Sequence, residues 1–184
     1  MRLRFIKRRG ILTSLALIFP YEDQKTGDKK YYIYSHSFIP QRRMQEHMDK
    51  EDNAPYIIWQ KEGLLTVTTA AGGIKTDYKT ILAHLHNIID KYDIDLTAIG
   101  YDPHNASAFL LDLEDFGCDL VEIKQSARSL NDATIDFQLE VKAHNVEYDK
   151  KNKLLTRSMN DAILSEPNSF GEIKIDKMLQ KVRI

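Results

Sequence analysis

The segment LTAIGYDPHNA, residues 96–106, predicts a short strand that ends at an acidic residue and passes directly into a helix. Its first six residues are mostly apolar, Pro103 suits the first turn of a helix, and Asn105 to Phe116 carries apolar side chains at helical spacing. Gly117 ends that helix, and residues 119–123 predict the next strand. Strands that alternate with helices in this way indicate a parallel sheet.

Helices are predicted on both sides of this segment. Upstream, Asp77 is a suitable N-cap, and large apolar residues follow it at three- and four-residue spacing. These residues are Tyr78, Ile81, Leu82, Leu85, Ile88, Ile89 and Tyr92. Such a stripe predicts a helix packed on a sheet. Downstream, residues 130–143 predict a helix capped by Asn131 or Asp132.

The first half of the chain has the pattern of antiparallel strands. Residues 12–19 form a short apolar run between Gly10 and Pro20, which predicts a first strand buried on both faces. A polar turn leads to the aromatic run 31–38, and the two runs together predict a hairpin. Helices over residues 41–50 and 55–62 should follow, and residues 64–68 should add a third strand.

The resulting order of three strands, then helix, strand, helix, strand and helix is that of the ribonuclease H-like architecture. We therefore expect an α/β fold in which an antiparallel meander continues into parallel strands, so that helices flank a mixed sheet. A length of 184 residues with 42% hydrophobic content suits one globular domain. We expect residues 1–10 to be an atypical basic N-terminal segment and residues 11–184 to form the domain.

Composition excludes several classes of protein. The single cysteine, Cys118, excludes an intrachain disulfide framework, favours a reducing compartment and is best explained as a buried, inert thiol. Basic residues before the apolar run imitate a secretory signal, but no small-residue cleavage pattern follows and the run is too short for a membrane span. The net charge of −1 neither requires nor excludes a polyanionic partner, so any contact with DNA needs a local basic patch.

Asp102 is the residue whose position most suggests chemistry. It stands where a predicted parallel strand ends, which is where ligands bind in open α/β sheets. Its hard oxygen donors suit Mg²⁺ or Mn²⁺, and two such ions can activate water and stabilise a leaving phosphate-ester oxygen. A structural role as the cap of the following helix would explain the same residue. The histidines, by contrast, lack partners at zinc-like spacing.

Several stretches, in this order, resemble the nuclease domain of the large terminase subunits of tailed phages and prophages. These stretches are residues 12–15, 31–40, 59–68, 77–78, 101–106 and 125–130, with Asn160 and Lys177. The resemblance implies a ribonuclease H-like, metal-dependent endonuclease that cleaves concatemeric viral DNA during packaging and holds two Mg²⁺ or Mn²⁺ ions. It also implies double-stranded viral DNA, the portal and the small terminase subunit as partners, no membrane, and the cytoplasm of a bacterial host.

Site residues follow from the resemblance and from their charge. Asp102 matches the family's central acidic ligand, which makes it the expected catalytic and metal-binding residue. Asp176 is a second candidate for the metal, although a solvated charged face would also explain it. Phosphate contacts are expected from basic residues that could equally be ordinary surface charges. These are Lys124, Arg128, Lys174 and Lys177.

The chain departs from the pattern of the family's nuclease domain in two places. Residues 4–10 hold no aspartate where the family has one on its first strand, and the chain stops at Ile184 where a further family aspartate would come. Residues 72–76 do not form a Walker A motif, so the family's ATPase motor is absent from this sequence. We therefore expect a fragment or a decayed prophage copy that is truncated at its C-terminus. The alternative to an active nuclease is a catalytically incomplete module that docks on DNA or the portal.

Overall fold

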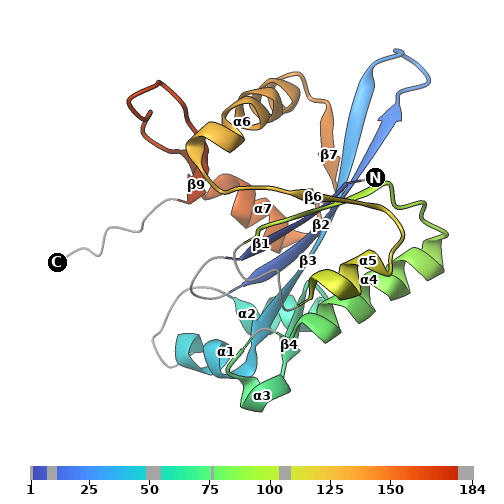
Figure 1. Cartoon of the computed structure of the whole chain (residues 1–184), viewed down its shortest axis with the longest axis vertical. Coiled ribbons are helices and arrows are strands. Elements are labelled where there is room, and N and C mark those ends of the chain that lie inside the picture. The colour runs from blue at the N-terminus through green and yellow to red at the C-terminus, as the bar shows by residue number, and fades with distance from the viewer. Residues whose placement is uncertain (1, 8–11, 49–54, 76, 104–108, 178–184) are drawn as a thin grey trace.

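A computed structural model of the chain describes residues 2–7, 12–48, 55–75, 77–103 and 109–177. Within these residues a mixed sheet runs in the order β4-β3-β2-β1-β5-β6, with β7 beside β3, and β8 and β9 form a separate hairpin (Figure 1). The predicted mixed α/β fold with flanking helices is confirmed. The strands are β1 (Arg2–Lys7), β2 (Thr13–Glu22), β3 (Lys29–Pro40), β4 (Leu65–Thr68), β5 (Ala98–Tyr101), β6 (Asp119–Glu122), β7 (Val146–Tyr148), β8 (Ala162–Leu164) and β9 (Ile175–Lys177). The helices are α1 (Gln41–Met48), α2 (Tyr56–Lys61), α3 (Ala70–Gly73), α4 (Tyr78–Tyr92), α5 (Leu110–Glu114), α6 (Ala127–Lys142) and α7 (Lys153–Asn160).

The antiparallel meander begins one strand earlier than the sequence predicts. Strand β1 pairs with β2, and β2 pairs with β3, both in antiparallel register. The apolar run expected to be the first strand is therefore the second. It is also not buried on both faces, because Thr13, Leu15 and Leu17 are buried while the residues between them are only half-buried. The basic residues 2–7 belong to the sheet because they pair with β2 on one side and β5 on the other.

The parallel part of the sheet is built by β1, β5 and β6. Strand β5 lies parallel to β1 on one side and to β6 on the other. The three strands therefore end at the same edge, as the alternation of strands and helices predicts.

Strand β4 does not continue the antiparallel meander, in which the sequence predicted it as the third strand. It pairs parallel to β3, with Leu65 opposite Ser37. Helices α1 and α2 lie between the two strands and carry the chain back to the starting edge, which a crossover to a parallel strand requires. Strand β7 also pairs parallel to β3, with Val146 opposite Tyr31.

The main core lies between the sheet and α4. Leu15, Leu17 and Phe38 from the sheet pack against Ile81 and Leu85 of α4. Asp77 caps that helix as predicted, since its side chain accepts hydrogen bonds from the N–H groups of Lys79 and Thr80. Tyr92, the last residue of the predicted stripe, is not part of the buried face, because its side chain is 63% exposed. The helix ends at Tyr92, and Asp93 follows in a left-handed conformation.

The helices after residue 109 differ in their limits from the prediction. Helix α6 starts at Ala127, and its cap is Ser126, whose hydroxyl accepts a hydrogen bond from the Ser129 N–H. The expected cap at Asn131 or Asp132 is therefore wrong. Only the end of the predicted helix over residues 105–116 can be compared, because residues 104–108 lie outside the described residues. There, α5 covers Leu110–Glu114.

The chain beyond residue 143 adds elements for which the sequence made no prediction. These are β7, α7, β8 and β9. Helices α4 and α5 lie on one face of the sheet, whereas α6 and α7 lie on the other (Figure 1). Asn152 joins α7 to the sheet, since its amide donates to the Ser35 carbonyl at 3.0 Å while its oxygen caps the helix.

Candidate functional site at the carboxyl edge of the parallel strands

Strand β5 delivers Asp102 to the edge at which the parallel strands end. Ile99 and Gly100 are buried within the strand, and Asp102 is the first residue beyond it and half-buried. Pairing with the neighbouring strand continues past the regular ladder, because the Ile123 N–H donates to the Tyr101 carbonyl at 2.8 Å. The backbone that presents Asp102 is therefore held by β1 on one side and by β6 with its extension on the other.

The chain that follows Asp102 returns to the core at Phe109. Phe109, only 5% exposed, stacks on Tyr78 with ring centroids 4.3 Å apart. This stack joins the start of α4 to the start of α5. Phe109 is also the N-cap residue of α5, without a side-chain capping hydrogen bond. The sequence also allows Asp102 to act only as the N-cap of the following helix. The start of that helix would lie in residues 104–108, which are outside the described residues.

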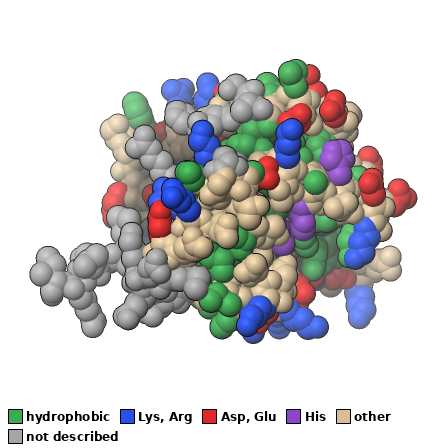
Figure 2. Space-filling model, turned by 90° about the horizontal axis from the view of Figure 1, so that it is seen from below, with side chains coloured by type: hydrophobic (Ala, Val, Ile, Leu, Met, Phe, Trp, Pro, Cys, Tyr) green, Lys and Arg blue, Asp and Glu red, His purple; other side chains and the backbone are tan. Residues whose placement is uncertain are grey.

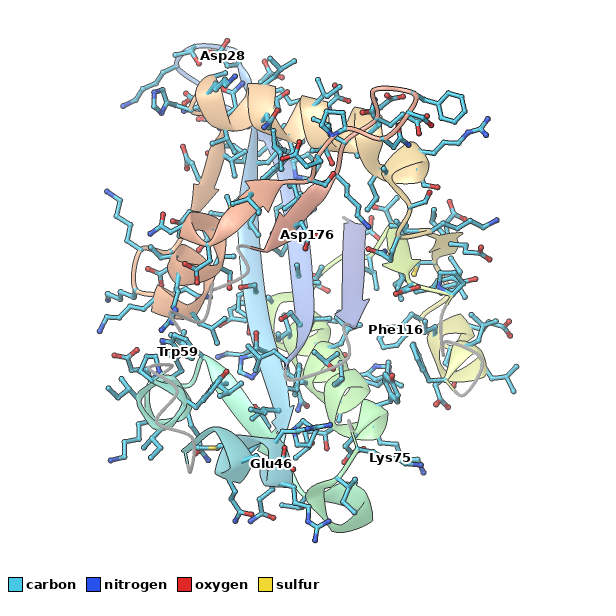
Figure 3. All side chains as sticks on the ribbon, turned by 90° about the vertical axis from the view of Figure 1, so that its left-hand side faces the viewer. Asp28, Glu46, Trp59, Lys75, Phe116 and Asp176 are labelled. Carbon is cyan, nitrogen blue, oxygen red and sulfur yellow. The ribbon has the colours of Figure 1, made fainter. Side chains whose placement is uncertain are left out.

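The β8–β9 hairpin reaches the same region from the C-terminal part of the chain. The Lys174 ammonium donates to the Gln125 carbonyl at 3.0 Å, and the Ile173 N–H donates to Asn131 Oδ1 at 3.0 Å. Both acceptors follow β6, so the hairpin lies against the junction between β6 and α6. Asp176, on β9, is half-buried and stands in the middle of the face seen in Figure 3.

Glu122 is a carboxylate at this edge that sequence reasoning missed. It ends β6 and lies opposite Tyr101 in the parallel register. Because side chains alternate between the two faces of a sheet, it points to the face opposite the one expected for Asp102. No cluster of three or more His, Cys, Asp or Glu side chains that could hold a metal is present in the part of the chain that the structure describes.

Three of the four basic candidates gather at the β6–α6 junction. Lys124 is exposed, with its ammonium 3.9 Å from Glu122, and Arg128 is exposed in the first turn of α6. Lys174 contacts Gln125, which lies between these two in sequence. Lys177 belongs to β9, where it is opposite Ala162. On the face seen in Figure 2, basic and acidic side chains are interspersed, so a phosphate site would have to be local.

A pair of histidines forms a separate polar cluster in the core. The rings of His36 and His84 stack with centroids 4.1 Å apart. His36 Nε2 shares a 2.8 Å hydrogen bond with Thr66 Oγ1, and His84 Nε2 shares one of 3.2 Å with the Tyr34 hydroxyl. Burial, with a smaller contribution from the nearby His84, lowers the pKa of His36 to about 4. Burial also lowers the pKa of His84. Burial therefore disfavours protonation of both rings, and His36 is a buried core group.

Cys118 fits the expectation of an unreactive thiol only in part. It is half-buried rather than buried, and it packs against the main core. Partial burial raises the pKa of its thiol, so the reactive thiolate is disfavoured. Among the described helices, none is long and apolar enough to cross a membrane.

Comparison with known proteins gives one consistent result. The family described as "Terminase large subunit, endonuclease domain" matches residues 6–184. The large terminase subunit of Enterobacteria phage HK97 is 27% identical over 181 residues, which cover 97% of this chain and 33% of that protein. The crystal structure of the HK97 large terminase superposes with a TM-score of 0.74 at 26% identity, over 95% of this chain and 34% of that one. The chain thus spans about one third of the relative that it matches.

Proposed function

This chain belongs to the family of terminase large subunit endonuclease domains. On that premise we propose that it cleaves double-stranded viral DNA with a divalent cation bound by Asp102. The observation that carries the proposal is the position of Asp102, just beyond β5, at the edge where the parallel strands end. Cleavage of concatemeric DNA during packaging is the role that the family implies. Its portal and small terminase subunit would be the protein partners, and the host cytoplasm would be the place of action.

A ribonuclease H-like core accounts for the arrangement of the central strands. The antiparallel meander β1-β2-β3 continues through β1 into the parallel strands β5 and β6. The sequence predicts a meander that continues into parallel strands, although it places the meander at residues 12–19, 31–38 and 64–68. The observed order supports assignment of the sheet to this architecture, with β4 and β7 as additions along the outer edge of β3.

The donor set suits one hard cation better than two. Asp102 and Asp176 both offer carboxylate oxygens and are both half-buried. Mg²⁺ is usually held by one or two carboxylates together with waters and substrate phosphates, so these two residues fit one Mg²⁺ or Mn²⁺ ion. A second ion, which the resemblance implies, would need further ligands, and the described residues form no cluster of three or more such groups.

The acidic and the basic candidates would have different roles in the reaction. An ion held by Asp102 and Asp176 would supply neutralising charge at the scissile phosphate and a more acidic water. Lys124, Arg128 and Lys177 would hold neighbouring phosphates, because ammonium and guanidinium groups position a DNA backbone without reading its sequence. Lys174, also a candidate from the sequence, has its ammonium bound to the Gln125 carbonyl. The location of Lys124 and Arg128 on either side of Gln125 supports a phosphate site at the β6–α6 junction.

Nicking of supercoiled plasmid tests the proposal. The wild-type chain should relax plasmid only when Mn²⁺ or Mg²⁺ is present. Asp102→Asn removes the charge but keeps the shape, and it should lower the rate by at least about a hundredfold if the carboxylate holds the cation. Asp112→Asn, an exposed aspartate on α5, is the matched control and should cut at the wild-type rate. Equal rates for wild type and Asp102→Asn would refute the assignment.

A non-catalytic docking module is the second candidate, and the lack of a three-ligand cluster among the described residues favours it. In that case Asp102 would be a remnant, and the basic residues at the β6–α6 junction would only bind DNA. The chain would then not cut even at high Mn²⁺, but it would bind duplex DNA with an affinity that falls as salt rises. Measuring nicking and DNA binding on the same preparation separates the two functions.

A further inference from the structure

The β8–β9 hairpin depends on side-chain contacts for its place on the molecule. The regular pairing of the two short strands is continued by Lys174, whose N–H donates to Ser165 Oγ at 3.1 Å and whose carbonyl accepts from the Ser165 N–H at 2.8 Å. Attachment to the rest of the fold comes from Ile173, bound to Asn131, and from the Lys174 ammonium, bound to the Gln125 carbonyl. A hairpin of three-residue strands has little apolar burial of its own, so these contacts matter for its position.

Lys174 and Asp176 point to the same side of the hairpin. They lie two residues apart in an extended segment, and side chains alternate along such a segment with a period of two. The direction of Lys174 is known, because its ammonium meets Gln125. Asp176 should therefore face the β6–α6 junction as well, and Figure 3 places it centrally on this side of the molecule.

A continuous set of hydrogen bonds leads from Lys174 to the strand end that carries Asp102. Gln125 accepts from Lys174 with its carbonyl and donates with its amide to the Ile123 carbonyl at 3.0 Å. The Ile123 N–H in turn donates to Tyr101, the residue before Asp102. Displacement of Lys174 would therefore change the placement of the hairpin relative to this edge.

We propose that Lys174 is a positioning residue, which fixes the β8–β9 hairpin on the β6–α6 junction and so holds Asp176 toward the edge occupied by Asp102. The proposal rests on the proposed function, in which both carboxylates serve one cation. A lysine suits the attachment of the hairpin because its long side chain reaches the Gln125 carbonyl. Its charged ammonium also makes a stronger hydrogen bond to a carbonyl than a neutral donor would. The alternative is that Lys174 acts by touching a DNA phosphate.

Amide hydrogen exchange without metal or DNA tests the first half of the proposal. Lys174→Met keeps the stem but removes the ammonium, and it should raise exchange at the Ile173 and Ser165 amides at least tenfold. Lys174→Arg, which retains a charged donor, should keep most of the protection. Lys142→Met, at an exposed position near the end of α6, is the control and should leave both amides unchanged. Unchanged protection in Lys174→Met would overturn the proposal.

A double-mutant cycle on Mn²⁺ binding tests the second half. Asp176→Asn and Lys174→Met should each weaken Mn²⁺ binding measured by electron paramagnetic resonance, and the double variant should bind no more weakly than Asp176→Asn alone. Additive losses of Mn²⁺ affinity in the double variant would show that Lys174 acts independently of Asp176 and would refute positioning. A salt dependence of DNA binding that falls by about one phosphate contact in Lys174→Met would show that Lys174 contacts DNA instead. A wild-type chain that binds no Mn²⁺ would refute the proposed function instead, while the exchange data would still decide the hairpin's attachment.

Discussion

His36 is a polar residue that is buried in the core, where its ring stacks on that of His84. His36 is 6% exposed, lies against His84 and edge-on to Phe38, and satisfies its ring nitrogen through Thr66. A proton on His36 would place a charge in a buried position where a second ring is in contact. Burial therefore disfavours the charged form, which is why the pKa of His36 falls to about 4.

Stability should consequently fall as the solution is acidified from pH 6.5 to pH 4. An unfolded histidine takes up its proton near pH 6.5, whereas the folded protein resists protonation of His36 until about pH 4. The unfolded state binds more protons across this window, so the free energy of unfolding decreases, by up to roughly 3 kcal/mol for the shift of His36. Urea titrations at half-unit pH steps measure this slope.

Substitution of His36 identifies the source of the slope. His36→Gln can keep the hydrogen bond to Thr66 but cannot take up a proton, so it should flatten the pH dependence in the same window. His86→Gln, at an exposed ring that stacks on Phe116, should leave the slope as in wild type. A His36→Gln variant with an unchanged slope would contradict the assignment. The carboxyl of Asp23, whose pKa is lowered by its contact with Lys30, titrates below this window.

Helix α6 illustrates how one local interaction fixes the start of an element. Ser126 caps the helix through its hydroxyl, and this cap lies directly after the junction that contacts the β8–β9 hairpin. Ser126→Ala should lower the free energy of unfolding by about 1 kcal/mol, the usual cost of a lost N-cap. Ser126→Asp should restore it, because aspartate also caps and favours the helix dipole.

Ser129 provides the control for this prediction. Its hydroxyl contacts the Ser126 hydroxyl at 2.8 Å, but the cap itself uses the Ser129 backbone N–H. Ser129→Ala therefore keeps the cap and should cost less than Ser126→Ala in a urea titration. An equal or larger loss for Ser129→Ala would show that the hydroxyl pair, and not the cap, stabilises the start of α6.

Elements that depend on local sequence could be predicted, and those that depend on pairing could not. Helix α4 was predictable because Asp77 and the apolar stripe lie within one segment. Strand β1 was missed because its basic residues were considered only as the lead-in to the apolar run that follows, while its place in the sheet comes from β2 and β5. The parallel direction of β4 depends on how α1 and α2 return the chain, which no local pattern shows.

The same distinction applies to the candidate site as part of the whole molecule. The position of Asp102 just beyond a strand was predictable because a strand end followed by Pro103 is a local signal. The place of Asp176 depends on contacts between residues more than 40 positions apart, such as Ile173 with Asn131. Lys174 was expected either to contact a DNA phosphate or to be an ordinary surface charge, and the structure shows its ammonium in contact with Gln125. Assembly of a site from distant segments is thus the part that sequence patterns convey least.

At the scale of the whole molecule, the proposed function requires one divalent cation beside Asp102 at the carboxyl edge of the parallel strands. A crystal soaked in Mn²⁺ and measured for anomalous scattering tests it most directly. We expect one strong anomalous peak within about 2.5 Å of an Asp102 carboxylate oxygen, with Asp176 as a further ligand, and no such peak in Asp102→Asn crystals. A map without a peak at Asp102, or with a peak there that persists in Asp102→Asn, would show that Asp102 does not hold a cation.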